Sequence, residues 1–143
     1  MTAIQFTLYG EPVPQGRPRF ATVAGHAVAY DPKPSRDFKR DLKAAAQAHV
    51  PPALLTSALI CEIRIYRPVP KSFSQKRRAL ALRGVIRPTT KPDLKNYIAG
   101  IEDALENVLY ANDGQIVGYG DSGTWYGDPP RVEVKIEEVG RRE

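Results

Sequence analysis

Residues 90–115 read TKPDLKNYIAGIEDALENVLYANDGQ, and apolar residues recur in them with helical spacing. The apolar side chains stand three or four positions apart, at Leu94, Ile98, Ile101, Leu105 and Val108. A stripe of this kind is typical of a helix that buries one face in a hydrophobic core. We therefore predict a helix from Asp93 to about Leu109, with a second aspartate, Asp113, just beyond its end.

The two aspartates raise a geometric problem for a metal site. A straight helix of this length is about 24 Å long, so carboxylates at its two ends cannot share one ion. A shared site would then form where the following strand returns along the helix, or between two subunits. Asp103 offers a nearer partner, because Asp93, Asn96, Gly100 and Asp103 fall within about 80° on the polar side of the helix. The alternative is that Asp93 only caps the helix and Asp103 is only solvated.

Apolar periodicity predicts the remaining elements around this helix. Strands are expected at residues 3–9, 57–66, 115–119 and 131–138, with the last two antiparallel and a small hairpin over residues 20–30. Two more helical segments are expected, one from an N-cap at Ser35 to about His49 and a basic one from an N-cap at Ser74 to Arg83. Strand 57–66 is expected to be central. We expect a fold of the α/β (α+β) class, a small mixed sheet with two main helices, in a single domain over residues 1–143.

Charge is unevenly distributed along the 143 residues, although the net charge is only +5. Residues 1–92 hold 16 Lys and Arg against 5 Asp and Glu, whereas residues 93–143 hold 5 against 11. The basic part can attract a polyanion and the acidic part can hold a cation, although both sets are equally consistent with solvated surfaces.

Several classes of protein are excluded or disfavoured by composition. Cys61 is the single cysteine, so an internal disulfide or a Cys-rich zinc site cannot form. The sequence contains no signal peptide pattern and no apolar run long enough to span a membrane, so we expect a soluble, cytoplasmic protein without a membrane partner. A glycine-rich phosphate loop is also absent, so no nucleotide cofactor is expected.

Basic side chains form two candidate nucleic-acid contacts. Arg17 and Arg19 lie in a proline-rich loop, and a longer basic tract follows later in the chain. That tract comprises Lys71, Lys76, Arg77, Arg78, Arg83, Arg87 and Lys91. These cations are expected to neutralise backbone phosphates. Phe20, Tyr30 and Phe73 lie near them and could stack on bases, although core positions are the commoner outcome for such aromatics.

The motifs resemble those of the RusA family of Holliday junction resolvases, in the form found in prophage-like contexts. The family pattern is K-P-D-x-D-N, a lysine three residues on, D-A-L, and then D-D-x-Q. This chain has KPDLKN at 91–96, DAL at 103–105 and NDGQ at 112–115, and its GEPVPQGRPR at 10–19 is similar to the family's G-x-P-x-P-x-x-R-P-R opening. The resemblance implies an α/β homodimer that binds branched DNA and cuts it with Mg²⁺, for which Mn²⁺ is a possible substitute.

The resemblance also implies roles for particular residues. Asp93 matches the first essential carboxylate, Asp113 the later one, and Asp103 the acid of the D-A-L motif. Lys95 stands where the family usually has its second aspartate, and Ala99 stands where it has the motif lysine. Lys95 either supplies the charge that Ala99 lacks, for example by stabilising the transition state, or marks the loss of catalysis.

Three functional hypotheses follow. The first is a Mg²⁺-dependent, structure-selective endodeoxyribonuclease that resolves four-way junctions by paired nicks. In it Asp93, Asp113 and Asp103 hold the metal, Lys95 assists catalysis, and the two basic groups hold DNA; two symmetric nicks fit a homodimer with two sites. The second is a junction-binding protein of the same fold whose catalysis is impaired by Lys95 and Ala99. The third is a basic RNA-binding module.

Overall fold

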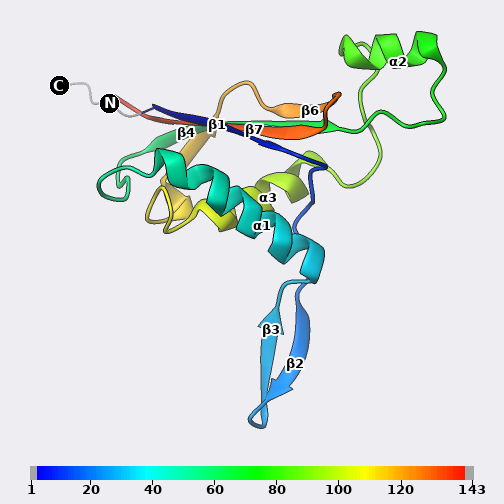
Figure 1. Ribbon diagram of the computed structural model, residues 1–143. Helices are drawn as coiled ribbons and strands as arrows, with labels where there is room; N and C mark the ends of the chain where they lie inside the picture. Colours follow the sequence, from blue (N-terminus) through cyan, green and yellow to red (C-terminus); the bar gives the residue numbers. More distant parts are fainter. Residues whose placement is uncertain (1–2, 141–143) are drawn as a thin grey trace.

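The protein has an α+β fold in which helices cover one face of a mixed sheet (Figure 1). The computed structural model describes residues 3–140 of the predicted domain; residues 1–2 and 141–143 lie outside the described part. The sheet contains β1 (Ala3–Tyr9), β4 (Leu59–Arg67), β5 (Ile116–Tyr119), β6 (Gly123–Tyr126) and β7 (Arg131–Glu138). Its order is β1-β7-β4-β5, and β6 also pairs with β4.

Strand β4 is the centre of the sheet, as its sequence predicted. It runs antiparallel to β7 from Leu59, opposite Glu138, to Tyr66, opposite Arg131. Its other edge pairs in parallel with two short strands, first β5 and then β6. Because strand side chains alternate in direction, every second residue of β4 from Leu59 to Ile65 is buried against the helices.

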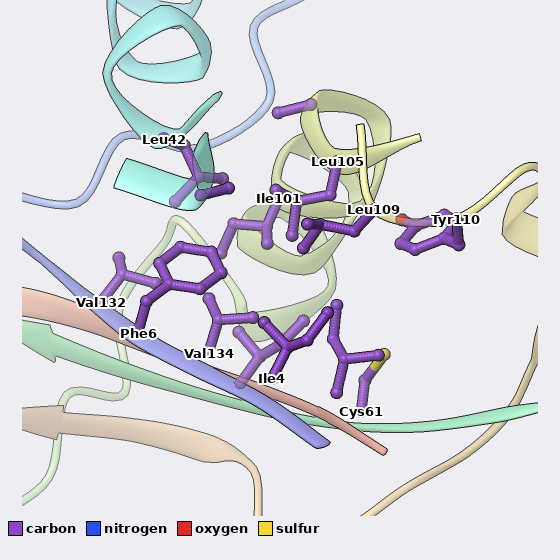
Figure 2. Close-up of a cluster of buried hydrophobic side chains, with 14 of the residues drawn as sticks. Ile4, Phe6, Leu42, Cys61, Ile101, Leu105, Leu109, Tyr110, Val132 and Val134 are labelled. Atoms are coloured by element: carbon purple, nitrogen blue, oxygen red, sulfur yellow. The ribbon is translucent and has the colours of Figure 1, made fainter. Parts of the chain in front are cut away.

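Helices α1 (Lys33–Ala46) and α3 (Leu94–Leu105) lie side by side under the sheet (Figure 1). Leu42 of α1 and Ile101 and Leu105 of α3 share one core cluster with Val132 and Val134 of β7 (Figure 2). Full burial of each such side chain contributes about 1.5–3 kcal/mol. The apolar stripe of the sequence therefore fixes which side of α3 faces away from solvent.

Two parts of the chain project from this body in opposite directions (Figure 1). One is a hairpin of β2 (Arg19–Val23) and β3 (His26–Tyr30), in which every residue of both strands is exposed. The other holds α2 (Gln75–Leu82), whose N-cap is Ser74, as predicted. The expectation that Phe20 and Tyr30 are core residues was wrong: their exposed fractions are 72% and 41%.

Helix boundaries differ from the prediction at two places. Helix α3 ends at Leu105, because Glu106 is extended and Asn107 takes a positive φ of 65°, a conformation that Asn tolerates better than most residues. Helix α1 begins at Lys33 with a proline in its first turn, so Ser35 is not its N-cap. The Ser35 hydroxyl instead accepts a hydrogen bond of 3.3 Å from the Gly16 N–H.

The pairing of the C-terminal strands also differs. Residues 115–119 and 131–138 do form β5 and β7, but they do not pair with each other, since both flank β4. Strand β6 was not predicted at all. Its four residues are too short a segment to show a clear alternation.

Gly100 was placed on the polar side of the α3 helix, but it is buried. The loop before β2 crosses it, and the Gln15 N–H donates a 3.1 Å hydrogen bond to the Asn96 carbonyl oxygen. A Cβ atom on Gly100 would lie 3.3 Å from the Gln15 nitrogen. Glycine at this position therefore allows the proline-rich loop to lie directly on α3.

We expect Gly100→Leu to push this loop off the helix and to lower the free energy of unfolding by about 1–3 kcal/mol, as overpacking does. Urea denaturation followed by circular dichroism measures the change. The matched control is Ala99→Leu on the exposed neighbouring position. Equal stability of the two variants would contradict the contact.

Candidate functional site

Asp113 is held at the far end of α3 by a turn whose polar groups satisfy one another. The Asn112 side chain accepts a 2.7 Å hydrogen bond from the Gly114 N–H. The Gln115 side chain accepts from the Asn112 N–H at 2.7 Å, and its Nε2 donates to the carbonyl oxygen of Leu55 at 2.8 Å. Within the NDGQ motif, Asn112 and Gln115 therefore shape the turn that presents the Asp113 carboxylate.

Two glutamates that the sequence interpretation missed surround Asp113. The buried Tyr110 hydroxyl lies 3.1 Å from Asp113 Oδ1 and 2.7 Å from the Glu102 carbonyl oxygen, which places Asp113 beside the last turn of α3. Glu102 Oε1 accepts a hydrogen bond from the Tyr119 hydroxyl of β5. Glu106 is the C-cap of α3, and its carboxyl group interacts directly with that of Asp113.

Crowding of carboxylates changes their ionisation. Burial raises the pKa of Glu102, the Asp113 charge adds to this, and the Tyr119 hydroxyl opposes it. Desolvation and then the Asp113 charge raise the pKa of Glu106. Desolvation followed by the same carboxylate also raises the pKa of Tyr110, so its hydroxyl keeps its proton. The end of α3 is therefore a region of negative potential that a cation would relieve.

Asp93 lies at the opposite end of the same helix. It is the N-cap of α3, and its Oδ1 accepts a 3.1 Å hydrogen bond from the Asn96 N–H. A pocket of about 320 Å³ between residues 88–94 and Thr124 borders it. Since the 12 residues of α3 span about 18 Å, one protomer does not bring Asp93 and Asp113 together.

Lys95 and Asp103 have different neighbours around α3. At 100° per residue, Lys95, Ala99 and Glu102 fall within about 60° of one another. Lys95 is exposed and thus shares a side of the helix with Glu102. Asp103 faces α1 instead, where its carboxylate lies 2.7 Å from the ammonium of Lys39.

Lys39 ties three segments together. Its side chain is 8% exposed, and its ammonium also lies 2.7 Å from Asp31, the first residue after the hairpin. Burial lowers the pKa of Lys39, but the hydrogen bonds to Asp103 and Asp31 outweigh it and leave the pKa raised. Asp103 therefore has a structural partner within its own chain.

The predicted DNA-binding residues fall into two groups, one at the hairpin and one around α2 (Figure 1). Arg17 and Arg19 lie at the base of the hairpin, and the later tract lies on α2 and its flanking loops. Within this tract Arg78 pairs with Asp128, and the Arg77 guanidinium lies 4.1 Å from the centre of the Phe73 ring.

Arg87 belongs to an aromatic stack that fixes the loop after α2. Its guanidinium lies 4.3 Å from the Trp125 ring centre, and the ring stacks on Tyr66 at 5.6 Å. Such contacts contribute about 0.5–2 kcal/mol each. Lys71, Lys76 and Lys91 are exposed.

The chemistry of the donors at the end of α3 fits a hard divalent cation. Carboxylate oxygens are the protein ligands that Mg²⁺ prefers, and it commonly uses one or two of them together with water and substrate phosphate. Within residues 3–140, no group of three His, Cys, Asp or Glu side chains is arranged to hold a metal ion.

Comparisons with known proteins agree with these motifs. Residues 9–137 match the family model described as endodeoxyribonuclease RusA. The chain is also 43% identical over 141 residues to uncharacterized protein YqaN of Bacillus subtilis (strain 168), covering 97% of this chain and 99% of that protein. Within the described residues, no helix is long and apolar enough to cross a membrane.

We expect Asp113→Asn to raise the melting temperature of the metal-free protein by a few degrees at neutral pH, because it removes a repulsive charge from Glu102 and Glu106. The folded-state pKa of both glutamates lies above the ordinary value of 4.5, so their ionisation costs stability as the pH rises through that range. The gain should therefore vanish near pH 3.5, where these groups are protonated. Thermal melts in EDTA at both pH values measure it, and Asp121→Asn is the control.

Proposed function

The chain belongs to the RusA endodeoxyribonuclease family, and from this we propose that it is a metal-dependent, structure-selective endodeoxyribonuclease that resolves four-way DNA junctions by paired nicks. The match over residues 9–137 carries the proposal. The crowded carboxylates around Asp113 support it, because metal-dependent phosphodiester hydrolysis needs oxygen ligands at one point. We propose residues 1–143 as one domain that works on DNA in the cytoplasm.

Asp113 is the proposed metal ligand, with Glu106 in direct contact and Glu102 beside it. A bound Mg²⁺, or Mn²⁺ in its place, would polarise the scissile phosphate and lower the pKa of a water molecule. The residues of this chain would orient that site: Tyr110 positions the Asp113 carboxylate, and Tyr119 positions that of Glu102. Asp103 is the weaker candidate ligand, since Lys39 already binds it.

Asp93 is proposed to complete the site of a second subunit. Its separation from Asp113 along α3 prevents both from serving one ion within a protomer. In a homodimer with two-fold symmetry, Asp93 of each subunit can approach Asp113 of the other, which gives two equivalent sites. Two such sites would match the two strands that must be nicked across a junction.

Lys95 would enter the shared site from the same end of α3 as Asp93, because Asp93 is the N-cap and Lys95 is the second residue of the helix. An ammonium there would stabilise negative charge that develops on the phosphate in the transition state. The second candidate function is junction binding without cleavage. The observation that favours it is that Lys95 and Ala99 replace an aspartate and a lysine of the family pattern.

DNA would be held by the two projecting basic groups. The hairpin carries Arg17 and Arg19 at its base, and Phe20 is exposed enough to stack on an unpaired base. The tract on the α2 side offers further phosphate contacts from Lys71, Lys76, Arg77, Arg78, Arg87 and Lys91.

Cleavage of a labelled synthetic four-way junction tests the proposal. We expect paired symmetric nicks with Mg²⁺ or Mn²⁺, none with EDTA, and at least about a hundredfold slower cleavage by Asp113→Asn. Junction binding by this variant should stay close to that of the parent. Tight binding without any product from the parent protein would support the second function instead.

Mixed dimers test the shared site. Asp93→Asn and Asp113→Asn subunits carrying different tags are co-expressed, and the heterodimer is isolated through both tags. If each site joins two subunits, the heterodimer keeps one intact site and nicks one strand, whereas both homodimers are inactive. An inactive heterodimer would show that the two aspartates act within one subunit.

A further inference from the structure

Helix α1 carries opposite charges on two separate flanks. At 100° per residue, Arg36, Lys39 and Lys43 fall within about 60° on one flank, and Asp37 and Asp41 lie together on the other. Arg40 lies between the flanks and reaches Asp37 at 3.4 Å and Asp41 at 3.3 Å. The basic flank, defined as Arg36, Lys39 and Lys43, was not among the residues that the sequence assigned to DNA binding.

Two cations of this flank are free to meet a ligand. Lys39 is neutralised by Asp31 and Asp103. Among residues 3–140, no ion pair involves Arg36 or Lys43, and both side chains are exposed. Together with Lys39, Arg40 and Asp31 they line a pocket of about 310 Å³.

The position of the basic flank links the hairpin to α3. Lys39 lies in the middle of the flank and contacts Asp31 at the end of the hairpin and Asp103 on α3. The hairpin leaves the body at the N-terminal end of α1 (Figure 1). A polyanion that lies along this flank would therefore run from Arg17 and Arg19 toward the exposed side of α3.

We propose that the basic flank of α1 binds the phosphodiester backbone of a DNA arm, with Arg36 and Lys43 as its contacts. This inference rests on the proposed function and adds a binding surface to it. Arg36 and Lys43 are two helical turns apart, about 10.5 Å, which is too far for one small anion but suits a chain of phosphates. The flank lies on the helical side of the sheet, together with Asp113, Glu102 and Glu106.

The experiment compares salt dependence of junction binding for two double variants. Arg36→Gln with Lys43→Gln removes both free cations of the flank. Lys33→Gln with Lys135→Gln is the control, which removes the same charge from two ion pairs, with Asp37 and with Glu137. Fluorescence anisotropy with a labelled four-way junction in EDTA gives the affinity at several salt concentrations, and circular dichroism checks folding.

Each phosphate contact contributes about 0.9 to the slope of log affinity against log salt. We expect the slope of the flank variant to become shallower by about 1.8 and its affinity to fall roughly tenfold to a hundredfold at low salt. The slope and affinity of the control variant should stay close to those of the parent. A folded flank variant with the parental slope would overturn the inference. Cleavage and junction preference of the unaltered protein test the proposed function separately. If the protein neither cleaves junctions nor prefers them, the same salt titration on duplex DNA still tests the flank, because a shallower slope for the flank variant would show that Arg36 and Lys43 contact DNA.

Discussion

The length of α3 is the constraint on which the interpretation of this protein depends. Its apolar side is held in the core by Ile101 and Leu105, which are almost completely buried, so the helix cannot rotate or shift without exposing them. The helix between its N-cap and its last residue therefore keeps its length of about 18 Å. A metal site that uses both Asp93 and Asp113 must span this length, and the proposed second subunit would do so.

Lys39 has a comparable influence on the other side of α3. A buried ammonium is costly unless it is fully paired, and here two carboxylates share it. The pairing connects α1, α3 and Asp31, the first residue after the hairpin, into one unit. The direction in which the hairpin leaves the body is therefore tied to the same helix that presents the carboxylates. The proposed DNA contacts and the proposed metal site are coupled through one side chain.

Local sequence patterns predicted most helices and strands of this fold. The errors occur where contacts between distant parts of the chain or the backbone conformation of one residue determine the structure. Periodicity gave β1, β4, β7 and the start of α3, whereas the end of α3 depends on the backbone conformation of Asn107. Burial of Gly100 depends on a loop from a distant part of the chain. The exposure of Phe20 follows from a hairpin that finds nothing to pack on within the described residues.

In the candidate site, too, the local motifs were predicted and the contacts between distant residues were not. The motifs picked out Asp113, but Glu102 and Glu106 join it only because the chain turns back after α3, which spacing along a helix does not reveal. The roles of Asp93, Asp103, Asp113 and Lys95 stay predictions.

Trp125 is the single tryptophan of the chain, and it lies between Tyr66 and Arg87. When tryptophan is excited selectively over the seven tyrosines, the fluorescence of the protein therefore originates at one place, where the loop after α2 meets the sheet. Its emission will report the solvation of that junction and will be insensitive to events at the hairpin. The molecule thus carries a built-in optical probe for only one of its two projecting parts.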